Sequence, residues 1–329
     1  MTLVLKRTLT AVAIATLSAL SALSAPEVMA SDLTVMARGG NGGGKGGGPG
    51  GDEPTPPAFY SWMHSEVQDG WDMGALGQGA TITIVDDFSS QWGYFGDLDQ
   101  DGTQELLRHG EWTALQASMI APSARIKEDD FAGGGRVRLA KGFNVLNLSY
   151  GMMAEAGYSR ILWGGQESSI ISHAQNGNAV IAKSAGNDAV AIGATNSDGL
   201  VDYLARDLIG AQSALFVGAL ERNGSTSNPA SLAYYSNYAG SDTVVQDQFL
   251  VVGVDRDAMG GLAGTSFAAP IVAGYSAMLH SKFESSSPTA VANRLLDTAR
   301  TDTISGYSES IHGQGEASIL NALGPDFIY

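Results

Sequence analysis

Short apolar segments alternate with helical segments along most of this chain, and this alternation limits the possible folds more than any other feature. Ala80–Val85 is rich in β-branched residues, and similar apolar runs follow at 143–149 and 179–182. Apolar strands that alternate with helices are typical of an α/β domain whose central sheet is mostly parallel. Further strands are expected at 215–218 and 249–252, and helices at 113–120, 161–175, 267–283, 288–300 and 316–323.

The N-terminus has the pattern of an export signal. Lys6 and Arg7 precede an apolar stretch rich in Ala and Leu, and Val28-Met29-Ala30 provides small residues for cleavage. This pattern predicts a signal peptide over residues 1–30 and a secreted or periplasmic protein. An uncleaved membrane anchor is the alternative, but the apolar run is short and contains several Ser and Thr residues. We therefore expect no stable membrane insertion once the signal is removed.

A glycine-rich stretch separates this signal from the rest of the chain. Residues 39–51 are almost entirely glycine and are followed by Thr55-Pro56-Pro57. Such a composition predicts a flexible linker, assigned here to residues 31–58. The remainder, residues 59–329, is expected to form one folded domain.

Charge and cysteine content exclude several kinds of partner and chemistry. The formal net charge is −16, whereas nucleic acids and anionic membranes are bound by basic surfaces. We therefore expect no nucleic-acid partner. The sequence contains no cysteine, which excludes disulfides, thiol nucleophiles and thiolate metal sites.

Four polar residues occupy the positions at which α/β domains build their sites. Asp86 follows a predicted strand, Asn187 lies just beyond another, and His109 and Ser266 each precede a helical segment. In parallel sheets, ligands bind at the carboxyl ends of the strands and at the helix N-termini that follow. All four side chains are therefore expected on the same edge of the sheet.

These four residue types can together activate a serine. A serine hydroxyl needs a base within hydrogen-bond reach, which His109 can supply. Asp86 would orient the imidazole and stabilise its protonated form. The amide of Asn187 and the backbone N–H of Ser266 could bind a developing oxyanion.

The same residues lie in segments that resemble those of the subtilases, the subtilisin-like serine proteases. The resemblance is closest to catalytic domains of autotransporter subtilases, here without their barrel. It implies a three-layer α/β fold with a mostly parallel central sheet flanked by helices. It also implies a serine endopeptidase that cleaves protein or peptide substrates through an acyl-enzyme, with no cofactor required for the chemistry. The matching segments are Ile82–Asp87, His109-Gly110, Ala185–Asp188 and Gly264–Pro270.

The resemblance further implies where a substrate would bind. One segment is expected to pair with the substrate backbone as an added strand, and a second to form a wall of the pocket for the residue before the scissile bond. The first comprises Leu148, Ser149, Tyr150 and Gly151, and the second Ser184, Ala185 and Gly186.

One segment departs from the family pattern. After His109-Gly110, the usual Thr-His-Val is replaced by Glu111-Trp112-Thr113. Glu111 could raise the pKa of the imidazole or face solvent. A catalytically inactive, exported binding or scaffold module of the same fold is therefore the alternative to a protease.

Three further features of the sequence are less specific. Asp97, Asp99 and Asp101 alternate as in the opening of a calcium-binding loop, so they indicate either a structural calcium site or a solvated acidic loop. Residues 128–130 are expected to form a solvated loop, and the aromatic residues of 92–95 are expected to fill core rather than line a cleft.

Overall fold

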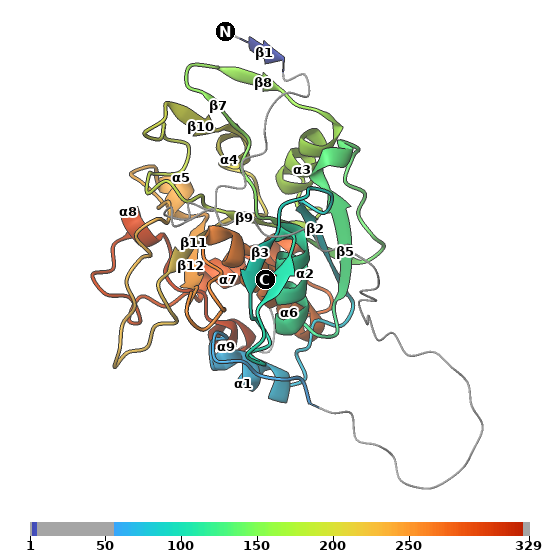
Figure 1. The fold of residues 1–329 in the computed structure, drawn as a ribbon, viewed down its shortest axis with the longest axis vertical. Helices are drawn as coiled ribbons and strands as arrows, with labels where there is room; N and C mark the ends of the chain where they lie inside the picture. The colour runs from blue at the N-terminus through green and yellow to red at the C-terminus, as the bar shows by residue number, and fades with distance from the viewer. Residues whose placement is uncertain (1, 5–55, 325–329) are drawn as a thin grey trace, which may run out of the picture. The chain divides into compact units, whose positions relative to one another are not determined.

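A computed structural model of the chain describes residues 2–4 and 56–324. Six strands form a central sheet in the order β12-β11-β9-β6-β2-β5, and every neighbouring pair is parallel (Figure 1). The predicted mostly parallel α/β sheet is confirmed. The predicted signal peptide and linker lie outside the described residues, apart from residues 2–4 and 56–58. The strands are β2 (Ala80–Asp86), β5 (Arg125–Asp130), β6 (Phe143–Leu148), β9 (Val180–Ser184), β11 (Ala214–Leu220) and β12 (Phe249–Gly253).

Helices cover both faces of this sheet and make it the middle of three layers. α2 (His109–Ile120), α6 (Ala269–Lys282) and α7 (Pro288–Asp297) pack on one face, whereas α3 (Gly165–Gln175) and α4 (Tyr203–Leu208) lie on the other. Alternate strand residues belong to opposite cores. Val180 joins the first core and Ile181 the second. Burial on both faces explains why the central strands are continuous apolar runs in the sequence.

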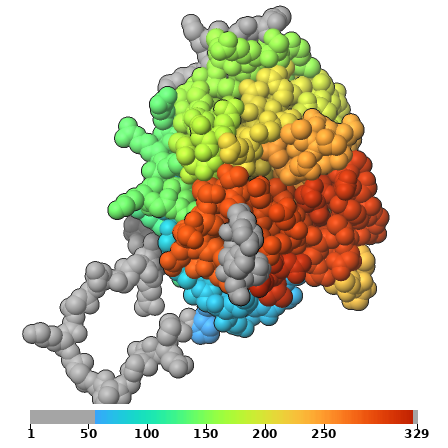
Figure 2. Space-filling model, turned by 180° about the vertical axis from the view of Figure 1, so that it is seen from behind, coloured from blue at the N-terminus to red at the C-terminus, as the bar shows by residue number. Residues whose placement is uncertain are grey.

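The remaining elements are short. Among them, α1 and α9, which come near the start and the end of the folded domain in sequence, pack against each other (Figure 1). In Figure 2 the blue first part of the domain adjoins the red last part. The helices are α1 (Glu66–Asp72), α5 (Thr243–Gln246), α8 (Glu309–His312) and α9 (Ile319–Leu323), with 3₁₀ turns η1 (Phe131–Gly133) and η2 (Thr265–Phe267). The strands, all in two-stranded pairs, are β1 (Thr2–Val4) with β8 (Arg160–Leu162), β3 (Tyr94–Gly96) with β4 (Glu105–Leu107), and β7 (Met153–Glu155) with β10 (Leu200–Asp202).

Three predictions about elements are wrong. Residues 128–130 do not form a loop but end β5, which pairs with β2 at the edge of the sheet. The helix predicted from residue 161 begins at Gly165, because the chain first forms β8. Trp92 and Phe95 do not fill core, since they are 70% and 62% exposed.

Candidate active site

The end of β2 and the start of α2 bring Asp86 and His109 together. Asp86 is fully buried and His109 is nearly so. Their side chains are joined by a hydrogen bond of 2.6 Å between Nδ1 of His109 and Oδ1 of Asp86. Because this contact occupies Nδ1, the other ring nitrogen, Nε2, is left for chemistry.

Two further donors hold the Asp86 carboxylate in place. The backbone N–H of Asp87 donates to Oδ1 at 2.7 Å, and the hydroxyl of Thr113 lies 3.2 Å from Oδ2. Thr113 stands one turn along α2 from His109, so the helix itself supplies this support. Sequence reasoning overlooked Thr113, although it lies in the segment that departs from the family pattern.

Glu111 has a different role from the imidazole contact considered above. Its Oε2 accepts the backbone N–H of Arg108 at 2.6 Å, and its Oε1 lies 3.1 Å from the Arg108 guanidinium. Glu111 therefore caps the N-terminus of α2, one of the positions at which an acidic side chain stabilises a helix. The cap fixes the first turn, which carries His109.

The pKa of His109 is raised above its usual value. Burial alone would lower this pKa, because it disfavours the charged ring. The charge and hydrogen bond of Asp86, with a smaller contribution from Asp87, outweigh that effect. The pair therefore stabilises a protonated imidazole inside the protein.

Ser266 lies in η2, directly before α6. Gly264 precedes it with a φ of 121°, a backbone conformation that side-chain-bearing residues rarely adopt. Pro270 is the second residue of α6, where its missing N–H leaves no broken helical bond. The sequence thus makes a sharp turn that displays a half-buried serine at the start of a helix.

Ser266 and Ser149 are joined by reciprocal hydrogen bonds. The Ser266 hydroxyl donates to the Ser149 carbonyl at 3.1 Å, and the Ser149 hydroxyl donates to the Ser266 carbonyl at 2.8 Å. Within the described chain no hydrogen bond connects Ser266 to His109, but the ring of the next residue, Phe267, lies 5.9 Å from the His109 ring. Contacts between catalytic groups are often loose before substrate binds.

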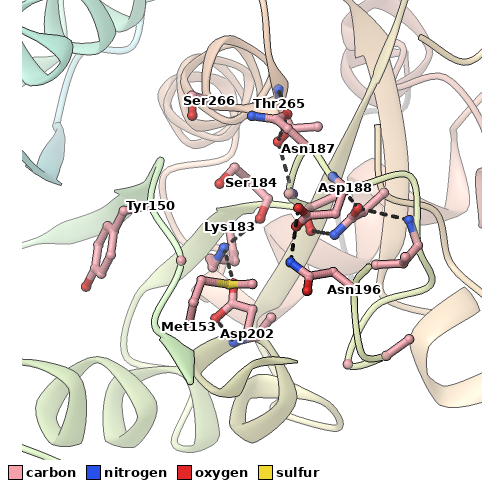
Figure 3. Close-up of a pocket in the computed structure, with 18 of the residues that line it drawn as sticks. Tyr150, Met153, Lys183, Ser184, Asn187, Asp188, Asn196, Asp202, Thr265 and Ser266 are labelled. Carbon is pink, nitrogen blue, oxygen red and sulfur yellow. Dashed lines mark hydrogen bonds and ion pairs between the residues drawn. The ribbon is translucent and has the colours of Figure 1, made fainter. Parts of the chain in front are cut away.

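Asn187 lies beside this turn at one end of a cavity (Figure 3). Its Oδ1 accepts the backbone N–H of Thr265 at 2.8 Å and the Thr265 hydroxyl at 3.0 Å. The Thr265 hydroxyl in turn accepts the N–H of Gly186 at 3.0 Å. Since two donors fix the amide oxygen on the Thr265 side, the orientation of the whole Asn187 amide is fixed.

Asn237 and Tyr235 support the two loops that carry Asn187 and Ser266. Oδ1 of Asn237 accepts the N–H groups of Asp188 and Val190, while its Nδ2 donates to the Ala185 carbonyl at 2.9 Å. The Tyr235 hydroxyl accepts the N–H of Gly264 at 3.0 Å. Sequence reasoning did not predict these supporting roles, because they depend on contacts between distant segments.

The cavity beside Ser266 is bounded by most of the predicted substrate-binding residues. Leu148 differs from them, because its side chain is in the core and its backbone already lies between β2 and β9 in the sheet. The predicted residues that do line the cavity are Ser149, Tyr150, Gly151, Ser184, Ala185 and Gly186.

Asp97, Asp99 and Asp101 come together in the turn between β3 and β4. Each offers a carboxylate oxygen, and these oxygens lie within 4.8 Å of one another. Oδ1 of Asp97 is buried and has no hydrogen-bond partner among the described residues. Burial, followed by the neighbouring carboxylates, raises the pKa of Asp99. An oxygen set of this kind fits a hard cation such as Ca²⁺.

The sequence profile of the subtilase family matches residues 110–317. This chain is a subtilase. The family resemblance inferred from the four segments is thereby confirmed, and with it membership of a serine-protease family. The matched region includes Asn187 and Ser266 but begins just after His109. The link of Asp86 and His109 to Ser266 therefore rests on the geometry described above.

Solved protease structures share the fold. The prenylagaramide maturation protease PagA is 19% identical over 79% of this chain and 98% of its own, with a TM-score of 0.51. MycP1 from the ESX-1 type VII secretion system and MycP1 from Mycobacterium smegmatis are each 19% identical, with a TM-score of 0.51. They cover 83% of this chain, and 89% and 88% of their own. Among curated proteins, none matches the sequence significantly.

Proposed function

We propose that this subtilase is a secreted or periplasmic serine endopeptidase with Asp86, His109 and Ser266 as its catalytic triad. The observation that carries the proposal is the buried 2.6 Å contact between Asp86 and His109, whose ring packs beside the turn that holds Ser266. A buried carboxylate on Nδ1 sets the tautomer in which Nε2 can accept a proton. Export rests on the N-terminal sequence pattern. No helix in the described part of the chain is long and apolar enough to cross a membrane.

The reaction would proceed in two halves. The Ser266 hydroxyl turns from the Ser149 carbonyl toward His109, gives its proton to Nε2, and attacks the peptide carbonyl. His109 then passes that proton to the leaving amine, which leaves an acyl-enzyme on Ser266. Water, deprotonated by His109, attacks the ester, and His109 returns that proton to the Ser266 oxygen as the ester bond breaks and the acid product leaves.

Asn187 would stabilise the oxyanion formed in each half. Thr265 holds the oxygen of this amide and thereby fixes the side of the group on which the amide nitrogen lies. Together with the backbone N–H of Ser266 it forms two donors for the negative oxygen. The substrate backbone would lie along Ser149–Gly151 as an added strand.

Labelling with a fluorophosphonate probe tests the proposal. Such probes react with serines activated by a neighbouring base, so we expect one adduct, on Ser266. Ser266→Ala and His109→Ala should abolish it, whereas Ser168→Ala, at an exposed serine of α3, should not. A folded protein that fails to label, with and without added calcium, would support the inactive binding module instead.

We also propose that Asp97, Asp99 and Asp101 hold a structural calcium ion. The buried, unpartnered Oδ1 of Asp97 favours this over a solvated loop, because such an oxygen requires a partner. Calcium should raise the melting temperature of the wild type, since it binds only the folded state. Asp99→Asn should weaken this effect, and Asp198→Asn, at an exposed aspartate elsewhere, should not. An unchanged melting temperature in EDTA would identify a solvated loop.

A further inference from the structure

A buried ion pair lies at the inner end of the cavity beside Ser266. Lys183, in β9, is only 1% exposed, and its Nζ lies 3.1 Å from Oδ2 of Asp202. The same Nζ donates to the Ser184 carbonyl at 2.7 Å. Figure 3 shows Ser266 at one end of the pocket and Lys183 and Asp202 at the other, with Ser184 between them.

The Asp202 carboxylate cannot move freely. Its Oδ1 accepts the backbone N–H groups of Met152, Leu204 and Ala205 at 3.0 to 3.2 Å. The last two belong to the first turn of α4, so Asp202 is also the N-cap of that helix. Oδ2 is therefore held in one position, and Lys183 with it.

Each member of the pair retains a hydrogen-bonding site. An ammonium has three donors, and two of those on Lys183 are used by Asp202 and Ser184. Oδ2 of Asp202 has Lys183 as its hydrogen-bonding neighbour among the described residues. Both residues line a cavity of about 50 Å³, which has room for a few water molecules or one modest side chain.

We propose that Lys183 and Asp202 select a carboxamide side chain, asparagine or glutamine, in the substrate residue whose carbonyl Ser266 attacks. This inference rests on the proposed function. The carboxamide oxygen accepts from Nζ of Lys183, and the carboxamide NH₂ donates to Oδ2 of Asp202. A carboxamide is a planar group that carries an acceptor and a donor side by side. It can therefore bind the ammonium and the carboxylate at the same time.

Other side chains would bind Lys183 and Asp202 less well. A basic side chain would place a second cation beside Lys183. An acidic one would face both Asp202 and the carboxylate of Asp188, which also lines the cavity. An apolar side chain would displace water from the pair and leave its hydrogen-bonding sites unmet.

Cleavage of a peptide series tests this selection. The peptides differ only in the residue before the scissile bond, which is Asn, Gln, Leu, Lys or Glu. We expect the higher kcat/KM of the two carboxamide peptides to exceed that of each other peptide by about 10- to 100-fold, the range for hydrogen bonds to charged groups. Lys183→Met should remove that advantage. Lys127→Met is the matched control, because Lys127 pairs with Asp129 at 3.5 Å on β5, outside the cavity.

Two measurements separate the possible failures. Fluorophosphonate labelling counts the active sites in each variant, so a loss of folded enzyme is not mistaken for a loss of selectivity. If Lys183→Met does not fold, because Asp202 is left unpaired, the double variant Lys183→Met/Asp202→Asn removes both charges and keeps the helix cap. A preference for Lys, Glu or Leu, or a carboxamide preference that survives these variants, overturns the proposal. A wild type that neither labels nor cleaves overturns the proposed function as well.

Discussion

At the scale of single residues, the contact between Asp86 and His109 makes a specific prediction about pH. Only a neutral imidazole can act as a base, so kcat/KM should rise as His109 loses its proton. Asp86 raises the pKa of His109, so this rise should be centred above the usual histidine value of about 6.5. In Asp86→Asn, the rise should move to lower pH. At neutral pH, kcat/KM should fall by about 10⁴-fold, as for the corresponding change in other triads.

The pH profiles of wild type and Asp86→Asn, measured with one peptide substrate, check this. Thr113→Val is a graded control, because it removes one hydrogen bond to the same carboxylate and should cost about 3- to 10-fold. If the rise of kcat/KM with pH did not move in Asp86→Asn, the group that titrates there would not be His109. The triad assignment would then fail.

At the scale of elements, Asn237 acts on the loop that carries Asn187. It bonds to three backbone groups of residues 185–190, and Gly186 is its direct neighbour. A Cβ at Gly186 would lie 2.4 Å from Nδ2 of Asn237, so the two segments approach too closely for any other residue there. Asn237→Ala should loosen the Asn187 amide and lower kcat by about 10- to 100-fold with little change in KM, as expected when an oxyanion donor is misplaced.

A double-mutant cycle distinguishes this positioning role from general destabilisation. If Asn237 acts through Asn187, then Asn237→Ala should cost much less in an Asn187→Ala background. Asn176→Ala, at an exposed asparagine that follows α3, is the control. It should leave kcat unchanged and should not alter the effect of Asn237→Ala. Additive losses in the double variant would mean that Asn237 contributes stability alone.

At the scale of the whole molecule, the sequence specifies the buried strands better than the partly exposed ones. β6, β9, β11 and β12 are apolar because both faces of the central sheet are covered, and this composition makes them recognisable. β5 is an edge strand with charged side chains, so its sequence resembles a loop. The four site residues could be assigned to one edge because parallel strands all end there. Thr113, Asn237 and the pair of Lys183 with Asp202 could not be foreseen, since their roles come from contacts between distant segments.

The two ends of the folded domain meet around a pair of buried glutamates. Glu66 of α1 accepts the Ser318 hydroxyl at 2.7 Å and pairs with Arg300 at 3.4 Å. Glu316 is 3% exposed, and its Oε1 accepts the N–H of Gly224 at 2.9 Å. Its Oε2 is buried with no hydrogen-bond partner in the described part of the chain. Burial raises the pKa of Glu316 and outweighs the hydrogen bond from Gly224, which acts to lower it.

This raised pKa predicts how stability depends on pH. The folded state holds the Glu316 proton more tightly than the unfolded chain, so this group stabilises the fold at pH values below its ordinary pKa of 4.5. That contribution is lost as the pH rises through the folded pKa, because the buried carboxylate becomes charged. Glu316→Gln keeps the acceptor for Gly224 and cannot ionise. Its free energy of unfolding relative to wild type should therefore increase between pH 4 and pH 8, and its melting temperature should rise with it.

Thermal unfolding of both proteins between pH 4 and pH 8 measures that difference. Glu221→Gln provides the control, since the Glu221 side chain is 52% exposed and its replacement should leave the pH dependence unchanged. If Glu316→Gln lost stability relative to wild type as the pH rose, the charged form of Glu316 would be the one that the fold favours. The buried carboxylate would then be an anchor for the C-terminal segment rather than a source of acid-favoured stability.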